Sequence, residues 1–140
     1  MRKPAFEWLT AANDDLLTIR EIIDKSYLAH IAAFHAQQCV EKALKALLEA
    51  RESTVPKIHH TLKLGKMVGE DFDITESDEE MFDTLDQLYI ESRYPGDTGL
   101  LPYGKPTEED AEAFYRFAET FFGRVCRTLN ISAEEFRHDA

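Results

Sequence analysis

The chain has 140 residues, a length typical of one domain with a single core, and its 44% apolar content excludes an intrinsically disordered protein. Its 16 basic and 27 acidic residues give a net charge of −11, which disfavours unspecific binding to nucleic acids. No apolar run reaches the roughly 20 residues that cross a bilayer, and the first residues lack a secretory signal, so we expect a cytoplasmic protein without membrane contact.

Two amphipathic helices are predicted in the first 50 residues. Apolar residues three or four positions apart predict a helix from about Phe6 to Ser26. A longer helix spans Tyr27 to Ala50 and carries a seam of small and branched apolar residues. The seam consists of Ala29, Ala33, Ala36, Val40, Ala43, Leu47 and Ala50. Its alternating steps of four and three keep one side of the helix toward its neighbours, so this helix is expected to be the spine of a bundle.

The opposite side of the spine helix carries a polar, partly basic stripe. The stripe consists of His35, Gln38, Lys42 and Lys45. Lys42 and Lys45 could contact phosphate groups. A lysine stripe beside Glu41 and Glu49 is more often a solvated face with i,i+3 and i,i+4 ion pairs. His35 is expected to be exposed to solvent or to lie at a subunit contact.

A loop and a short helix follow the spine. Pro56 breaks the helical pattern between Ser53 and His60, and the sequence HHTLKLGKMV then indicates a short helix with Leu64 on its apolar side. Farther along, Ser77 and Glu80 have the spacing of a capping box, which predicts the start of the third long helix. That helix is expected to end at Pro95 and Gly96.

The last long helix is expected to begin near Thr107 and to reach Leu129. Three acidic residues directly after Thr107 place negative charge at the positive end of the helix dipole. The tail, residues 130–140, is expected to fray or to form one more turn. Without any strand alternation, the chain is predicted to be a single domain over 1–140, an all-α up-down four-helix bundle with a short extra helix and a core at about 6–129.

Neither the cysteines nor the acidic clusters predict a metal or cofactor site. Cys39 and Cys126 lie far apart inside apolar helical patterns, which favours free buried thiols. Paired acids such as Asp14 and Asp15 occur at helix faces or helix starts, where solvation and the helix dipole explain them. We therefore expect no cofactor and no metal.

Five passages of the sequence are similar to a known family. They are WLTAANDDL (Trp8–Leu16), AFHAQQCVEKALKALL (Ala33–Leu48), HTL (His60–Leu62), LYIESRYPG (Leu88–Gly96) and EEDAEAFYRFAE (Glu108–Glu119). Together they resemble the HEPN domains of prokaryotes over roughly residues 6–129, specifically the group often encoded beside a minimal nucleotidyltransferase. One departure from the family pattern is Gly65, where the short helix usually continues with leucine one step after Leu64, and it affects local packing only.

The resemblance implies a helical bundle that commonly dimerises. The family includes metal-independent ribonucleases, toxin partners of nucleotidyltransferase antitoxins, and noncatalytic binding modules. Its active members share an arginine followed after four to six residues by a histidine. Arg93 lies in the matching region, but the three positions for the histidine are Thr98, Gly99 and Leu100. The ribonuclease signature is therefore absent from this sequence.

Tyr89 and Arg93 are four residues apart, so a ring and a guanidinium share one helix face. Such a pair could stack a base and hold a phosphate. An equally weighted alternative is that Arg93 pairs with an acidic side chain and Tyr94 packs before Pro95. The ligand-binding residues expected from these arguments are Lys42, Lys45, Tyr89, Arg93 and Tyr94.

Two functions are consistent with the sequence. We favour a noncatalytic HEPN-type module that forms a homodimer and binds a nucleotide, RNA or a minimal nucleotidyltransferase partner, as part of a toxin–antitoxin pair. The alternative is a divergent metal-independent ribonuclease toxin that uses Arg93 with His60 or another base as the proton carrier. The simpler interpretation of His60 is that it orders the loop before the short helix by capping or hydrogen bonding.

Overall fold

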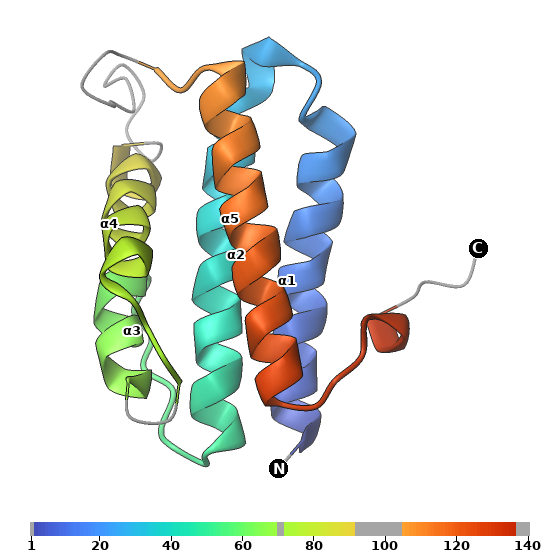
Figure 1. Cartoon of the computed structure of the whole chain (residues 1–140), viewed down its shortest axis with the longest axis vertical. Helices are drawn as coiled ribbons and strands as arrows, with labels where there is room; N and C mark the ends of the chain where they lie inside the picture. Colours follow the sequence, from blue (N-terminus) through green and yellow to red (C-terminus); the bar gives the residue numbers. More distant parts are fainter. Residues whose placement is uncertain (1, 70–71, 92–104, 137–140) are drawn as a thin grey trace.

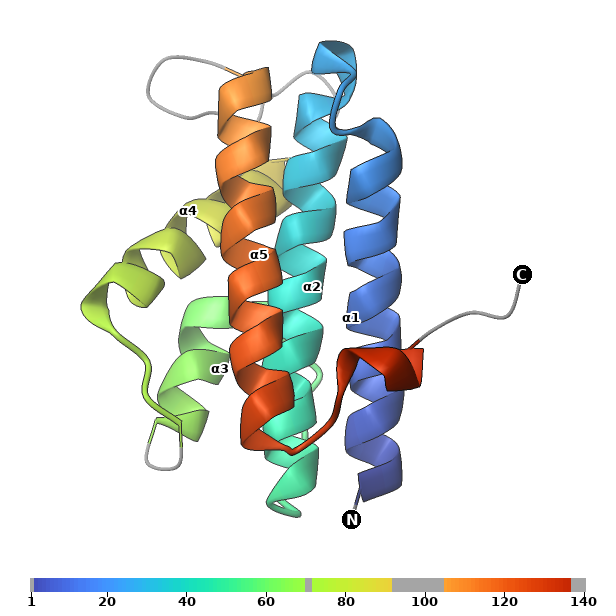
Figure 2. The same cartoon turned by 45° about the vertical axis from the view of Figure 1, so that its right-hand side comes forward.

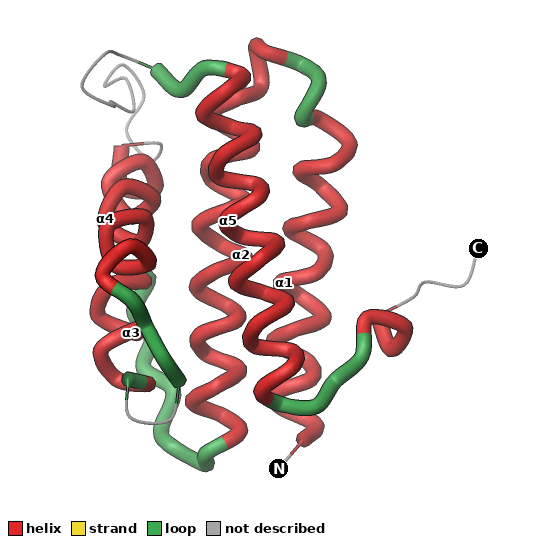
Figure 3. The backbone as a smooth tube through the Cα atoms, viewed as in Figure 1, coloured by secondary structure: helices red, strands yellow, loops and turns green. Residues whose placement is uncertain are grey.

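The structure is a computed structural model, and it describes residues 2–69, 72–91 and 105–136. Its elements are α1 (Arg2–Ile22), the 3₁₀ helix η1 (Ser26–Leu28), α2 (Ala29–Ala50), α3 (Thr61–Val68), α4 (Glu76–Glu91), α5 (Glu108–Thr128) and the 3₁₀ helix η2 (Ala133–Phe136) (Figure 1). Figure 3 shows only helices and loops in the described ranges, which confirms the predicted all-α class.

The central element is α2, which packs against α1, α3, α4 and α5. Figures 1 and 2 show α1 and α4 running in one direction and α2 and α5 in the other, with α3 and α4 together on the side of α2 away from α1. This is the predicted up-down bundle with a short extra helix, and α2 is its spine.

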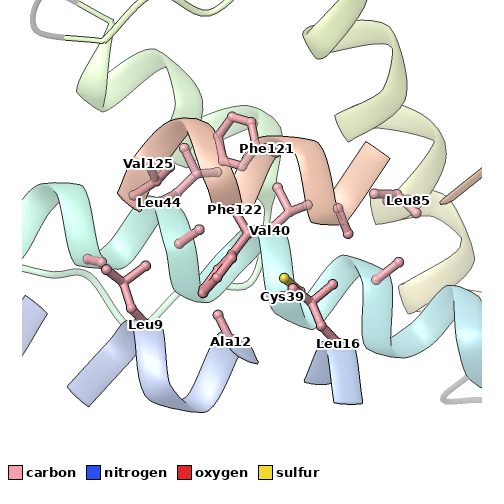
Figure 4. Close-up of a cluster of buried hydrophobic side chains, with 14 of the residues drawn as sticks. Leu9, Ala12, Leu16, Cys39, Val40, Leu44, Leu85, Phe121, Phe122 and Val125 are labelled. Atoms are coloured by element: carbon pink, nitrogen blue, oxygen red, sulfur yellow. The ribbon is translucent and has the colours of Figure 1, made fainter. Parts of the chain in front are cut away.

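The core lies where α1, α4 and α5 meet α2. Every residue of the predicted seam except the terminal Ala50 is buried. Figure 4 shows side chains of α1, α2, α4 and α5 gathered around this seam. Those labelled are Leu9, Ala12, Leu16, Cys39, Val40, Leu44, Leu85, Phe121, Phe122 and Val125. The small residues of α2 allow the neighbouring helices to approach closely, and the larger side chains of those helices fill the space between them.

The start of α4 differs from the prediction. The capping box is formed by Thr75 and Asp78, with 3.0 Å between Asp78 N and Thr75 Oγ1 and 3.0 Å between Thr75 N and Asp78 Oδ2. The predicted box of Ser77 and Glu80 is therefore wrong by two residues. Both pairs have the required spacing, but Asp78 Oδ1 also accepts a hydrogen bond from Arg124 of α5 at 3.0 Å. This tertiary contact supports the start at Thr75.

The other long helices deviate little from their predicted limits. Thr107 caps α5 as predicted, and Asp110 completes a capping box with it. The first helix begins earlier than predicted, at Arg2, because the first backbone N–H groups of a helix need no partner in the helix and Pro4 is tolerated there. This helix ends at Ile22 rather than at Ser26. After Ile22 the chain turns toward α2, and a hydrogen bond from Lys25 N to Ile22 O closes the turn.

The tail does not simply fray, since Ala133–Phe136 form a 3₁₀ turn and Phe136 is buried. Its ring stacks on Phe6 with 5.2 Å between centroids and lies 5.4 Å from the ring of Phe122. The predicted limit of the core at residue 129 is therefore too short by one turn. Among the described helices, none combines the length and apolarity needed to cross a membrane.

Candidate functional site

Four rings from three parts of the chain form a row on one side of α2. We call His35, Phe34, Tyr89 and His59 the ring row. Phe34 contacts His35 edge to face at 5.3 Å between centroids, and Tyr89 of α4 stacks on Phe34 at 5.6 Å with 14° between the planes. His59, in the loop before α3, lies 5.7 Å from Tyr89. The row thus has two apolar-faced rings in its centre and a histidine at each end.

A buried carboxylate of α1 holds the first histidine. His35 Nδ1 lies 2.8 Å from Asp15 Oδ1, and Lys42 Nζ donates to Asp15 Oδ2 at 2.8 Å. Asp15 is buried, and the side chain of His35 is only 25% exposed. His35 was expected to be solvent-exposed or to lie at a subunit contact. The first of these alternatives is wrong, because Asp15 of α1 pairs with the ring and the ring is largely covered.

The second histidine is held in the same manner by a carboxylate of α2. His59 Nδ1 lies 3.2 Å from each oxygen of Glu41, and Lys45 Nζ donates to Glu41 Oε2 at 3.0 Å. Glu41 and Lys45 are both buried, and the Lys45 ammonium faces the ring of Trp8 at 5.3 Å. The pairing with Trp8 and Glu41 satisfies a charge that would otherwise be costly to bury.

The loop that carries His59 is fixed by a polar network around Asp86. Gln37 Nε2 donates to His59 O at 2.7 Å and to Asp86 Oδ1 at 3.3 Å. Asp86 also accepts hydrogen bonds from Thr61 N at 2.9 Å and Leu62 N at 3.1 Å. A side chain of α4 therefore caps α3, which satisfies the exposed backbone donors at the start of that helix.

The side chain of His60 does not cap α3. It occupies the N-cap position of α3, but its side chain makes no capping hydrogen bond, and its Nδ1 lies 4.0 Å from Asp86 Oδ2. The reason is that the first backbone N–H groups of α3 already donate to Asp86, so they are not available to a capping side chain at His60. The prediction of capping by His60 is therefore wrong.

The remaining predicted ligand residues fall into three groups. Tyr89 lies in the ring row, and Lys42 lies at its His35 end, paired with Asp15. Lys45 forms the predicted i,i+4 ion pair with Glu41. Its side chain is only 5% exposed, so the prediction of a solvated face is wrong for this residue. Arg93 and Tyr94 lie outside the described residues, and their roles stay predictions.

Phe34, Glu41 and His59 were not predicted from the sequence as members of one site. Phe34 and Glu41 are seven residues apart and so share a face of α2, a signal that was available. His59 lies in the loop between α2 and α3, where no helical spacing connects it with the other two. Its partner and its ring neighbour come from α2 and α4, which no local pattern connects.

A separate hollow of about 770 Å³ lies between α1, α5 and the tail. Its apolar walls include Leu16, Phe122, Cys126 and Phe136, and no residue of the ring row lines it. Burial raises the pKa of the Cys126 thiol to about 11, so this thiol is protonated and unreactive at neutral pH. Within the part of the chain that the structure describes, no cluster of three or more histidine, cysteine or acidic side chains is placed to hold a metal ion.

Comparisons with known proteins give a consistent family. A profile of the HEPN domain matches residues 5–129. The crystal structure of TT1696 from Thermus thermophilus is 32% identical, with a TM-score of 0.77, and the match covers 91% of this chain and 99% of that chain. The crystal structure of ST0689, an archaeal HEPN homologue, is 26% identical, with a TM-score of 0.70 and coverage of 89% and 97%. No curated protein matches. The profile covers most of the sequence and the folds agree, and the chain belongs to the HEPN domain family.

Proposed function

We propose that this protein is a HEPN-type binding module that takes a nucleotide, free or within a short stretch of RNA, on the ring row. The observation that carries the proposal is the stacked pair of Phe34 and Tyr89, flanked on both sides by a histidine with a fixed Nδ1. Aromatic faces bind bases by stacking, at about 1–3 kcal/mol per base, and ring nitrogens can hydrogen-bond to phosphate or ribose.

The sequence after Arg93 favours a binding function over the cleavage reaction of the family's active members. None of Thr98, Gly99 and Leu100 can replace the histidine of the family's ribonuclease motif. With respect to that motif the module is noncatalytic.

The charges around the ring row favour a small ligand over a long nucleic acid. Asp15 and Glu41 neutralise the two lysines of the stripe, and the whole chain has a net charge of −11. Affinity for long RNA depends largely on several unpaired cations along the phosphate backbone, which this face lacks in its described part.

A protein partner is a second candidate, favoured by apolar exposure at the start of α2. The side chain of Tyr27 in η1 is 71% exposed and that of Ile31 in the first turn of α2 is 36% exposed, and exposed apolar groups are typical of interaction surfaces. A homodimer and a minimal nucleotidyltransferase, as in a toxin–antitoxin pair, are the proposed partners. Light scattering separates a dimer from the monomer of 16.1 kDa.

Titration calorimetry with ribonucleoside mono- and triphosphates and with a short single-stranded RNA tests the nucleotide proposal. Tyr89→Leu removes one of the two central rings but keeps apolar volume, so binding is expected to weaken by about 1–3 kcal/mol, or about 5- to 150-fold. Tyr27→Leu, which changes an exposed tyrosine away from the row, is the matched control and keeps wild-type affinity.

Arg93→Ala in the same titration tests the predicted phosphate contact. The bundle is expected to stay folded by circular dichroism while binding is lost. Unchanged affinity would remove Arg93 from the site, and equal affinities of the Tyr89→Leu and Tyr27→Leu variants would remove the ring row.

A further inference from the structure

We propose that the hollow between α1, α5 and the tail binds a small apolar molecule with one carboxylate, such as a medium-chain fatty acid, and that Arg127 holds the carboxylate. The hollow shares no residue with the ring row, so the proposal does not depend on nucleotide binding. It also gives a role to the tail, which lies beyond the family match at residues 5–129.

Three segments of the chain enclose the hollow. Figure 2 shows the tail leaving the end of α5 and crossing to α1. Phe136 of the tail lies 5.2 Å from the ring of Phe6 and 5.4 Å from the ring of Phe122, and so forms a wall that bridges the two helices. The volume of about 770 Å³ is within the range of roughly 300–1,000 Å³ that is usual for small-molecule sites.

The walls of the hollow suit an apolar ligand. They include Leu16 and Leu17 of α1, Phe122 of α5, and Ile131 and Phe136 of the tail. Hydrocarbon that moves from water into such a space is stabilised by the hydrophobic effect. Apolar walls with a few polar groups are also the usual lining of small-molecule sites, where the polar groups orient the ligand.

The charged residues that line the hollow are two arginines and one glutamate, which leaves one positive charge over. Arg20 Nε donates to Tyr115 Oη at 2.6 Å and Arg20 Nη2 to Glu119 Oε2 at 3.3 Å, so Arg20 and Glu119 neutralise each other. Arg127 is exposed, and no described residue forms a hydrogen bond or an ion pair with its guanidinium. A guanidinium binds a carboxylate through two parallel hydrogen bonds. The charge of the hollow therefore favours a ligand with a single anionic group, although the chain as a whole is acidic.

Gly123 leaves space beside the Arg127 guanidinium. This glycine lies in the interior of α5, where glycine is less favourable than alanine. Packing between helices does not require it, because in the described part of the chain a Cβ atom at this position would approach only Arg127 Nη1, at 3.4 Å. The guanidinium thus lies against Gly123, one turn earlier in α5, and both residues line the hollow. A glycine that weakens the helix is explained if the space beside it receives the head group of a ligand.

Titration calorimetry of the full chain with decanoate, decanol and decylamine tests the charge requirement. The three probes have the same apolar body and are used below the concentrations at which they form micelles. Decanoate is expected to bind with one molecule per chain, and decanol at least about 10-fold more weakly, because it lacks the charged hydrogen bonds to Arg127. Decylamine is expected to bind more weakly than decanol. Absence of decanoate binding, or equal affinities of the three probes, would overturn the proposal.

Arg127→Met removes the charge and keeps an apolar stem at this position. The affinity for decanoate is expected to fall by about 10- to 100-fold, the usual contribution of a hydrogen bond to a charged group, while the affinity for decanol stays unchanged. Arg116→Met is the matched control, because Arg116 is an exposed arginine of the same helix that does not line the hollow. Equal affinities of the two variants for decanoate would show that Arg127 does not hold the carboxylate.

Gly123→Leu separates binding from folding. Leucine favours a helix over glycine, so the melting temperature is expected to be no lower than that of wild type. The leucine side chain takes the space beside Arg127, and decanoate binding is expected to be lost. A folded Gly123→Leu variant with wild-type affinity would place decanoate elsewhere and overturn the proposal.

Tyr89→Leu shows whether the hollow and the ring row are separate sites. Decanoate is expected to bind this variant with wild-type affinity, because Tyr89 does not line the hollow. A loss of decanoate binding would place the probe on the ring row and contradict the assignment to the hollow.

Discussion

At the scale of single residues, Asp78 links the start of α4 to α5. Burial alone raises the pKa of its carboxyl, but hydrogen bonds from Arg124 and from Thr75 outweigh burial and lower the pKa below the ordinary value. A lowered pKa in the folded state means that this carboxylate stabilises the fold above its unfolded pKa of about 3.9. The stabilisation is lost as the pH falls through the folded pKa.

Asp78→Asn is therefore expected to lower the free energy of unfolding at pH 7 by about 1–3 kcal/mol, because Arg124 loses a charged partner. The difference from wild type should shrink as the pH falls below about 4 and vanish once the wild-type carboxyl is protonated in the folded state, below its lowered pKa. Urea unfolding at several pH values measures both effects. Asp73→Asn removes an exposed charge near Arg124 and is the control; a constant difference between Asp78→Asn and wild type at all pH values would contradict the assignment.

The polar stripe of α2 shows how far a residue pattern reaches. Spacing placed His35, Lys42 and Lys45 on one side of the helix, which the structure confirms. Spacing did not show that Asp15 would meet His35 or that His59 would meet Glu41, because those partners are 20 and 18 residues away. Burial of Lys45 likewise depends on Trp8 of α1.

At the scale of helices, the contact of α3 with α4 depends on Gly65. A Cβ atom at this position would lie 2.9 Å from Phe82 Cε2. Phe82 is fully buried and has little room to move, since the rings of Phe117 and Phe121 meet it edge to face. The departure from the family's leucine pattern thus has a packing reason.

Gly65→Ala is expected to destabilise the protein by about 1–2 kcal/mol, although alanine favours a helix by about 1 kcal/mol over glycine. Gly69→Ala is the matched control, because its Cβ would meet backbone atoms only at ordinary van der Waals distances of 3.6 and 3.7 Å. Chemical denaturation of both variants measures the difference. A more stable Gly65→Ala variant would show that Phe82 can yield.

Helix limits could be predicted to within a few residues, and the errors have tertiary causes. The sequence offers two capping boxes at the start of α4, and Arg124 of α5 favours the earlier one. The short α3 is capped from α4 by Asp86, a contact that no local motif announces.

At the scale of the whole molecule, the tail closes one side of the bundle beyond the 5–129 range of the family match. Phe136 packs on Phe6 of α1 and on Phe122 of α5, and so joins the two helices beside the hollow that it helps to line.

Phe136→Ala is expected to cost about 2–4 kcal/mol of unfolding free energy, near the lower end for buried phenylalanines because a terminal segment can relax. Glu134→Ala, at an exposed position of the same turn, should stay within about 0.5 kcal/mol of wild type. Thermal and urea unfolding provide the comparison. Equal stability of the two variants would mean that the tail does not contribute to the fold.

Local patterns in the sequence were enough to predict the helical class, the spine helix, its buried seam and the cap of α5, because helical periodicity and capping are properties of neighbouring residues. The ring row, the pairing of His59 with Glu41, the cap from Asp86 and the docking of the tail became visible in the folded chain alone. These features join residues from different elements. Their distances depend on how helices pack, and one-dimensional spacing does not contain that information.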